Sequence, residues 1–540
     1  GARRDKVRRR GGFMVISFAA NARGGTAGAH HRNIAGITAI ILAGCGLASP
    51  PARGLDSAVP RVGGDVSRTM LGDGTGVIVG IVDSGVDDTH PGLAGTDSQG
   101  MPRLVAEANV VPTEPGLSAD DVFGHGTFVT GIVMSSDATF TGMAPDARYV
   151  NARSINVNNG FDTTTWIEDG AGFAIDNGAT ILNFSLGTFA SLSSGTLDLD
   201  EMLDWASSQR GVISVVSAGN DGNTGDPQVG SPAGAFNVVT VGATEAPTYD
   251  QVTGFSSTGP TDDGRIKPDI VAPGTSITSL NDDWETGPDF RVSQGTSFAA
   301  PLVAGALAQV TDYGLINGLS TDPRVLRATL YNSAEKIADK SGDPWAPDAA
   351  SDVGGVYTVT SPLNPESGVG QLDAATLAEQ YMAGEQGPGT IGELGWDLNI
   401  IDAGGTATYE FALDLVAGSD FAATLVWDRV VDLIFDDGDG ALDSGEIFSA
   451  LGLTNLDLAL LLDGVEVAVS ESTVDSVEHL FFTIPETGAY TLEVRNAIGG
   501  FDDTIYGLAW SAIAVPEPGV AVLAAMGLIG FARRGRRSAG

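Results

Sequence analysis

Apolar runs of strand length alternate with helical patterns from residue 76 to residue 308. The apolar runs are rich in β-branched residues, as are strands buried on both faces of a sheet. They occupy residues 76–82, 148–154, 179–186, 211–217 and 238–243. Helical patterns cover 165–177 and 197–209, and the small and apolar residues 298–308 form a third. This alternation predicts an α/β fold with a parallel sheet and helices on both of its faces.

Three polar residues are candidates for a reactive site. Asp83 ends the first apolar run, His125 lies between two glycines, and Ser297 directly precedes the helix expected at 298–308. Unpaired N–H groups and the dipole at a helix N-terminus favour negative charge, which suits a reacting serine. Each residue alone also has a structural interpretation. Asp-Ser-Gly is a common turn, a single histidine is more often structural than catalytic, and serine is a common helix N-cap.

An ordered set of seven short motifs decides between these interpretations. In chain order they are Asp83-Ser-Gly, Gly124-His-Gly-Thr, Asn183-Phe-Ser-Leu-Gly187, Ala218-Gly-Asn220, Phe255-Ser-Ser-Thr-Gly-Pro260, Lys267-Pro-Asp-Ile-Val-Ala-Pro-Gly274 and Gly295-Thr-Ser-Phe-Ala-Ala-Pro301. The set resembles the subtilisin-like (S8 family) serine proteases over roughly residues 72–375. The resemblance implies a serine endopeptidase that hydrolyses protein or peptide substrates through an acyl-enzyme and requires no cofactor for the chemistry.

The resemblance also assigns roles to single residues. Ser297 matches the nucleophile, His125 the general base, Asp83 the carboxylate that orients the imidazole, and Asn220 the oxyanion donor. The walls of the primary specificity pocket are expected from Ser185, Leu186, Gly187, Ala218 and Gly219.

The chain departs from the family pattern in two places. Phe128 and Thr130 replace the usual histidine and alanine after Gly-His-Gly-Thr, and residues 49–71 are short for a folding-assistant propeptide. All four catalytic positions are nevertheless filled, which disfavours the rival function, a surface binding protein that uses the protease fold as a scaffold. An α/β-hydrolase esterase is disfavoured as well, because the sequence holds no Gly-x-Ser-x-Gly.

A second domain is predicted after the peptidase domain, which spans 49–383. Residues 384–395 are rich in glycine and predict a linker, and 396–513 show short alternating strands. The clearest strands are 406–413, 421–427, 456–462, 465–469, 479–484, 489–494 and 506–511. They predict an antiparallel β-sandwich that resembles the jelly-roll-like domains attached to many secreted peptidases. Such a domain binds substrate or surface polysaccharide, or braces the protease.

An acidic loop from Asp436 to Glu446 resembles an EF-hand loop. Four of its carboxylates fall on ligand positions and predict a calcium site: Asp437, Asp439, Asp443 and Glu446. The first ligand position, however, is occupied by Phe435. A solvated acidic hairpin loop is the alternative.

The N-terminal residues 1–48 resemble a basic leader followed by a signal peptide. The apolar run 34–48 has the length of such a peptide and ends at a plausible cleavage site, and a buried helix is the alternative. Leu42-Ala-Gly-Cys45 also resembles a lipoprotein box. Because Cys45 is the only cysteine, we expect neither a disulfide nor a thiolate metal site in a mature chain.

The C-terminal residues 514–540 resemble a PEP-CTERM sorting signal. Pro516-Glu-Pro518 precedes about 14 apolar or small residues, and an arginine cluster follows at 533–537. The apolar run is shorter than an ordinary bilayer-spanning helix. The resemblance implies an exosortase-type processing enzyme as a partner and export in a bacterium, to the cell envelope or the extracellular space. A plain tail anchor is the alternative.

The charge of the chain limits its partners. A formal net charge of −40 at pH 7 opposes binding to nucleic acid and to anionic lipid. Membrane contact is therefore expected only through the terminal segments.

Overall fold

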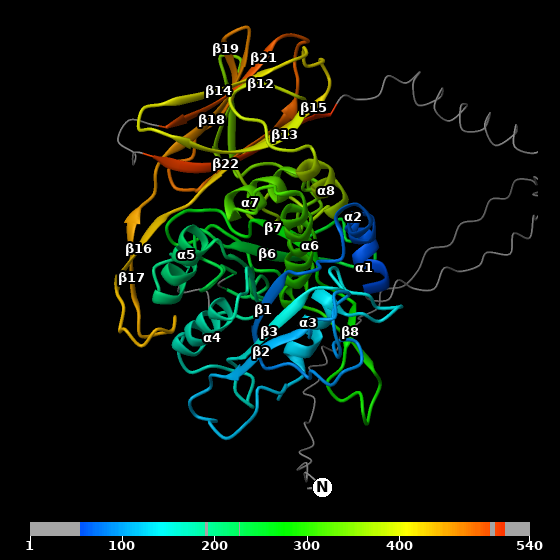
Figure 1. Ribbon diagram of the computed structural model, residues 1–540. Coiled ribbons are helices and arrows are strands. Elements are labelled where there is room, and N and C mark those ends of the chain that lie inside the picture. Colours follow the sequence, from blue (N-terminus) through cyan, green and yellow to red (C-terminus); the bar gives the residue numbers. More distant parts are fainter. Residues whose placement is uncertain (1–54, 189–192, 226, 497–502, 514–540) are drawn as a thin grey trace, which may run out of the picture. The chain divides into compact units, whose positions relative to one another are not determined.

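The computed structural model describes residues 55–188, 193–225, 227–496 and 503–513 (Figure 1). The part of the chain that holds the predicted peptidase motifs, called the peptidase part below, contains a seven-stranded sheet in the order β2-β3-β1-β4-β5-β6-β7. Every neighbouring pair of strands in this sheet is parallel. Its strands are β1 (Ile78–Asp83), β2 (Leu104–Asn109), β3 (Arg148–Arg153), β4 (Ile181–Phe184), β5 (Ile213–Ser217), β6 (Val239–Thr244) and β7 (Ile270–Pro273). The predicted parallel sheet is therefore confirmed.

Helices cover both faces of this sheet (Figure 1). One face packs in a hydrophobic core with α1 (Leu55–Arg61), α2 (Gly64–Leu71), α3 (His125–Met134) and α6 (Thr296–Asn317). The other face packs with α4 (Thr165–Asp176) and α5 (Asp198–Arg210). The period of two in a strand explains the division: Ile81 of β1 joins the first core and its neighbour Val82 joins the second. A short ribbon, β8 (Ile277–Leu280) with β9 (Phe290–Ser293), precedes α6.

Helix α6 is long and apolar enough to cross a membrane, but 83% of its most apolar window is buried inside the fold. It contacts β4, β5, β6 and β7 along one face of the sheet. We therefore interpret it as a core helix.

The C-terminal part is a sandwich of two sheets, as predicted. One sheet has the order β10-β11-β19-β18-β21-β14-β12 and the other β13-β22-β15-β20. The strands are β10 (Ala349–Val353), β11 (Val356–Ser361), β12 (Gly389–Ile391), β13 (Leu394–Ile401), β14 (Thr406–Phe411), β15 (Asp420–Trp427), β18 (Leu456–Leu462), β19 (Val465–Ser470), β20 (Val477–Thr483), β21 (Tyr490–Asn496) and β22 (Thr504–Ile513). Most pairs are antiparallel, while β11·β19 and β12·β14 are parallel.

The boundary between the two parts differs from the predicted one. Strands β10 and β11 lie within the range assigned to the peptidase but pair with the sandwich through β19. The predicted linker, 384–395, holds β12 and the first residues of β13. Strand pairing uses backbone groups, so a glycine-rich composition that looks like a linker does not prevent it.

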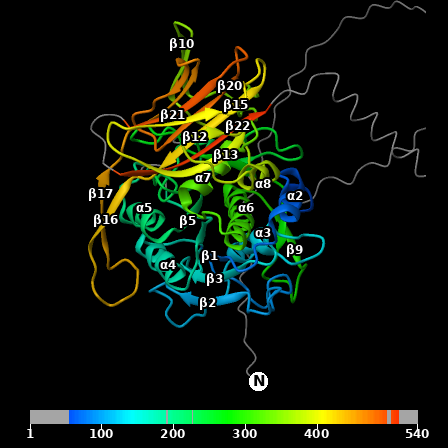
Figure 2. The same cartoon turned by 45° about the horizontal axis from the view of Figure 1, so that its top comes forward.

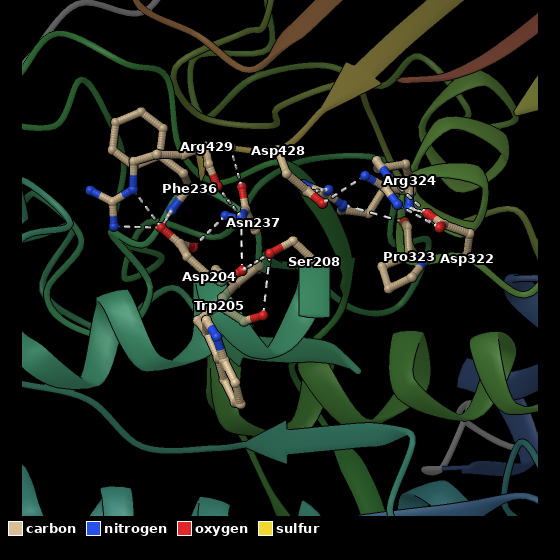
Figure 3. A network of polar contacts seen from close by, with 12 residues as sticks. Asp204, Trp205, Ser208, Phe236, Asn237, Asp322, Pro323, Arg324, Asp428 and Arg429 are labelled. Atoms are coloured by element: carbon tan, nitrogen blue, oxygen red, sulfur yellow. Dashed lines mark hydrogen bonds and ion pairs between the residues drawn. The ribbon is translucent and has the colours of Figure 1, made fainter. Parts of the chain in front are cut away.

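Some residues of the sandwich join the hydrophobic core of α6, while most of its buried apolar residues form a separate core between its two sheets. Helix α7 (Pro323–Asn332) packs on β22 and β15, and α8 (Ala374–Met382) contacts β13. Trp396 of β13 and Ala509 of β22 belong to the same core as the residues of α6. A buried polar network crosses the junction beside this core and joins Asp204 of α5 to Arg429 (Figure 3).

A long hairpin leaves the sandwich and runs along the peptidase part beside α5 and α4 in both views (Figures 1 and 2). It consists of β16 (Val430–Phe435), the acidic loop and β17 (Ile447–Gly452). Val431, Leu442 and Phe448 join the core that α4 and α5 form with the sheet, and the Phe448 and Trp205 rings lie 5.3 Å apart. We call residues 430–452 the β16–β17 hairpin.

Candidate active site

Asp83 and His125 meet at the carboxyl edge of the parallel sheet. Asp83 is the last residue of β1 and is fully buried, and His125 is the first residue of α3. The His125 Nδ1 lies 2.8 Å from Asp83 Oδ1 and 3.0 Å from Oδ2. Gly126 lets the start of α3 pack closely on the end of β1 and the loop after it, since a Cβ there would lie 2.1 Å from the Gly85 carbonyl oxygen and 3.2 Å from Asp83 Cβ. The carboxylate therefore fixes the orientation of the imidazole.

Asp121 holds the start of α3 in place, and sequence reasoning missed it. Its Oδ1 accepts hydrogen bonds from Ser84 Oγ at 2.8 Å and from the backbone N–H of Gly124 at 2.7 Å. Its Oδ2 accepts from the backbone N–H of Thr127 at 2.8 Å. A carboxylate just before a helix satisfies the unpaired N–H groups of the first turn. The available signal was an acid four residues before the histidine.

Ser297 lies at the start of α6, where the sequence placed it. Its Oγ donates a hydrogen bond to the Ser185 carbonyl oxygen at 3.0 Å, and Ser185 Oγ donates to the Ser297 carbonyl oxygen at 2.7 Å. The neighbouring Phe298 ring lies 5.5 Å from the His125 ring. The two hydrogen bonds join the first turn of α6 to the loop after β4.

Asn220 is held in one orientation by the residue before the serine. Its Oδ1 accepts from the Thr296 backbone N–H at 2.9 Å and from Thr296 Oγ1 at 3.2 Å. The Gly219 backbone N–H donates to Thr296 Oγ1 at 3.2 Å. With the oxygen turned to Thr296, the Nδ2 donor is turned the other way.

A cavity of about 510 Å³ brings these groups together. Its lining includes His125, Ser297, Asn220 and all five predicted wall residues, namely Ser185, Leu186, Gly187, Ala218 and Gly219. Asp83 lies behind His125, outside the lining. The lining also includes Ile155, Phe161 and Gly230, for which the sequence gave no motif.

The comparisons with known proteins bear on the same residues. The sequence model of the Subtilase family matches residues 74–360, more than half of the 540-residue chain. The chain belongs to the subtilase family. A second match, to the PEP-CTERM protein-sorting motif, covers residues 514–537, which lie outside the described residues.

Three relatives of this subtilase show how far the likeness extends. A thermophilic serine proteinase of Bacillus sp. (strain AK1) is 31% identical, with 49% of this chain and 58% of the relative covered. Subtilisin E of Bacillus subtilis (strain 168) is 32% identical, with 50% of this chain and 63% of the relative covered. Thermitase of Thermoactinomyces vulgaris is 30% identical, with 51% of this chain and 87% of the relative covered. The match thus spans between about three-fifths and nine-tenths of these relatives, and about half of this subtilase.

The two residues that depart from the family motif after His125, Phe128 and Thr130, are part of the packing beside the site. Phe128 is fully buried, with its ring 4.5 Å from that of Phe298. Thr130 is also buried and its Oγ1 donates to the Gly126 carbonyl oxygen at 2.7 Å. Neither side chain contacts the Asp83–His125 pair in a hydrogen bond among the described residues.

The predicted calcium ligands lie in the β16–β17 hairpin and do not line the catalytic cavity. The carboxylates that come within 4.8 Å of one another belong to Asp436, Asp437 and Glu446. The predicted ligands Asp439 and Asp443 lie outside this group. Asp439 Oδ1 accepts from the Ala441 backbone N–H at 2.7 Å, and Asp443 Oδ1 accepts from the Gly445 backbone N–H at 2.7 Å. The carboxylates that come together therefore differ from the predicted ligand set: Asp436 is added, and Asp439 and Asp443 are left out.

Proposed function

We propose that this subtilase is an exported serine endopeptidase with an Asp83–His125–Ser297 triad and Asn220 as oxyanion donor. The observation that carries the proposal is one cavity lined by Ser297, Asn220 and a histidine that is paired with a buried carboxylate. Membership of the family alone would not assign the chemistry, because one fold supports many functions.

The first half of the reaction forms an acyl-enzyme. The Ser297 hydroxyl turns from the Ser185 carbonyl oxygen toward His125 Nε2, and Oγ attacks the scissile carbonyl carbon as its proton passes to Nε2. Asp83 keeps the proton on Nδ1 and stabilises the imidazolium. The Asn220 Nδ2 and the Ser297 backbone N–H donate to the oxyanion, and one such donor is worth about 3 kcal/mol. The C–N bond then breaks, and His125 returns its proton to the leaving amine.

The second half repeats these steps with water as the nucleophile. His125 Nε2 takes a proton from water, the hydroxide attacks the acyl carbon, and the ester bond to Ser297 Oγ breaks with the proton returned to Oγ. No cofactor takes part. The loops that hold Ser185–Gly187 and Ala218–Gly219 line the cavity, and an extended substrate backbone would pair beside them as an added strand.

Export is supported by the match to the PEP-CTERM motif at residues 514–537. An exosortase-type enzyme would process this tail, and the leader at 1–48 would direct translocation. The shared core supports bracing as the role of the β-sandwich, since Trp396 and Ala509 pack in the core of α6.

A fluorophosphonate probe tests the proposed function directly. The probe phosphonylates a serine only where a base activates it, so we expect one label on the full chain, mapped by peptide mass spectrometry to Ser297. Ser297→Ala should lose both the label and casein cleavage. A folded protein without label, or with label on another serine, would contradict the proposal and favour a binding scaffold.

The pH profile should report the state of His125. Burial alone lowers the pKa of His125, but the charge of Asp83 and its hydrogen bond raise it, and the resulting pKa lies above the usual 6.5. The base must be neutral to accept the proton, so kcat/KM should fall as the pH drops through a value above 6.5.

Arg291 provides a second test of the same pKa. Its positive charge lowers the pKa of His125, so Arg291→Gln should move the acid limb of kcat/KM to higher pH. The exposed Arg210 serves as the control, and Arg210→Gln should leave the limb in place. A shift to lower pH in Arg291→Gln would contradict the assignment of His125 as the base.

A further inference from the structure

The tip of the β16–β17 hairpin, residues 436–446, concentrates negative charge without a basic residue. It contains Asp436, Asp437, Asp439, Asp443 and Glu446, and neither Lys nor Arg. Among the ion pairs of the described residues, none involves these carboxylates. We call this segment the acidic tip. Acidic loops alone are common, so the positions of the side chains decide whether it binds an ion.

Glu446 has the properties of an ion ligand. Its side chain is buried, with the residue only 6% exposed. Its Oε2 accepts from the Asp443 backbone N–H at 2.6 Å, while Oε1 is buried without a hydrogen-bond partner. A buried carboxylate oxygen without a partner is costly unless a cation or a donor meets it.

Other carboxylates face the same place. Ligand oxygens of Asp436, Asp437 and Glu446 lie within 4.8 Å of one another. A Cβ at Gly445 would lie 2.6 Å from Asp437 Oδ2 and 3.1 Å from Asp443 Oδ1, so these two oxygens also share one small space. The donors are all oxygens, which calcium prefers, and calcium accepts irregular sets of about six to eight of them.

The acidic tip lies directly on α4. The Leu442 side chain is buried in the core with α4 and α5, and its carbonyl oxygen would lie 1.5 Å from a Cβ at Gly172. The Leu442 and Ser444 backbone N–H groups donate to Asp176 Oδ2 at 2.9 Å and to Asp169 Oδ1 at 3.0 Å.

This docking brings like charges together. Asp176 is the last residue of α4, at the negative end of the helix dipole. The acidic tip therefore adds five carboxylates to a part of the peptidase that is already negative. A divalent cation would offset this repulsion.

We propose that Asp436, Asp437 and Glu446, with Asp443 beside them, bind a calcium ion that fastens the β16–β17 hairpin to α4. The site links the sandwich to the peptidase part by an ion, in addition to the shared core. It is independent of the Ser297 chemistry, so it stands or falls separately from the proposed function.

Calcium titration of the full chain tests the site. Glu446→Gln and Asp436→Asn each remove a ligand charge at nearly constant shape. Each should raise the dissociation constant for calcium at this site at least about tenfold. Asp439→Asn makes the same charge change in the same loop outside the ligand group and should bind calcium like the parent chain. Calorimetry with CaCl₂ measures all four proteins.

Thermal unfolding separates binding from a general charge effect. Calcium should raise the Tm of the parent chain and of Asp439→Asn relative to EDTA, and raise that of Glu446→Gln and Asp436→Asn much less. In EDTA, Glu446→Gln should be at least as stable as the parent, because it removes a buried negative charge that has no cation beside it when calcium is absent. An equal rise in Tm with calcium in all variants, or no rise in the parent chain, would contradict the proposed calcium site.

Hydrogen exchange tests whether the ion holds the β16–β17 hairpin against α4. In the parent chain and in Asp439→Asn, calcium should slow amide exchange in peptides from 165–176, and in Glu446→Gln it should not. Calcium binding that leaves exchange in α4 unchanged would overturn the link between the ion and the peptidase part. Exposed Asp436 gives a second variant if Glu446→Gln does not fold.

Discussion

Replacing Ser297 or His125 by alanine should lower kcat by nearly the same factor, and replacing both should lower it no further. The corresponding single losses measured in a subtilisin are on the order of 10⁶-fold, and we expect a comparable value here. The reason is that the two side chains act as one unit. A serine without its base is a poor nucleophile, and a base without the serine has no proton to take.

Steady-state kinetics on a chromogenic peptide measures the three variants against the parent chain. Ser341→Ala, a change at an exposed loop serine, is the control and should retain full activity. Equal Tm values would show that the losses are not caused by unfolding. If the two losses instead multiplied in the double variant, Ser297 and His125 would act independently, and the triad would be wrong.

The residues of the candidate site could be predicted because they occur in motifs with a fixed order. Asp83, His125, Ser297 and Asn220 are far apart in sequence, and the parallel sheet brings them to one edge because its strands all end there. Asp121 was missed because it belongs to none of the motifs and two of its hydrogen bonds come from backbone N–H groups, which every residue type except proline has.

In the sandwich, sequence patterns predicted some strands and missed others. The alternation of apolar and polar residues predicted β18 at Leu456–Leu462 with its observed bounds, because a strand with one buried face shows a period of two. The hairpin strands β16 and β17 were not predicted: their outer residues Ile434 and Ile447 are exposed apolar side chains, which disturbs the alternation. The joining of β10 and β11 to the sandwich depends on pairing with β19, about 110 residues later, which local patterns do not report.

Of the proposed substitutions, one that breaks the buried pair between Arg429 and Asp204 should lower the free energy of unfolding most. Asp204 is fully buried, and its Oδ2 accepts from Arg429 Nε at 2.8 Å (Figure 3). The Asn237 side chain closes the network, because its Oδ1 accepts from the Arg429 backbone N–H at 2.9 Å and its Nδ2 donates to the Asp204 carbonyl oxygen at 3.0 Å. Arg429→Met would leave the Asp204 charge buried without a cation, at a cost of about 3–5 kcal/mol.

Denaturant unfolding measures this cost, and two further variants interpret it. Arg495→Met breaks ion pairs of a partly exposed arginine, whose side chain is 31% exposed, and should cost no more than about 1 kcal/mol. Adding Asp204→Asn to Arg429→Met removes the unpaired charge and should recover part of the loss. A cost for Arg429→Met as small as that of Arg495→Met would contradict the buried pair.

The same unfolding curves decide whether the sandwich is a separate module. Arg429 directly precedes the β16–β17 hairpin, while Asp204 belongs to α5, so the pair joins the two parts. Residues from both parts also share the core of α6. With a shared core, Arg429→Met should shift one cooperative transition, seen at the same denaturant concentration by tryptophan fluorescence and by loss of peptidase activity. Two transitions, with activity surviving the first, would mean that the sandwich unfolds alone and that the junction contributes little to the stability of the peptidase part.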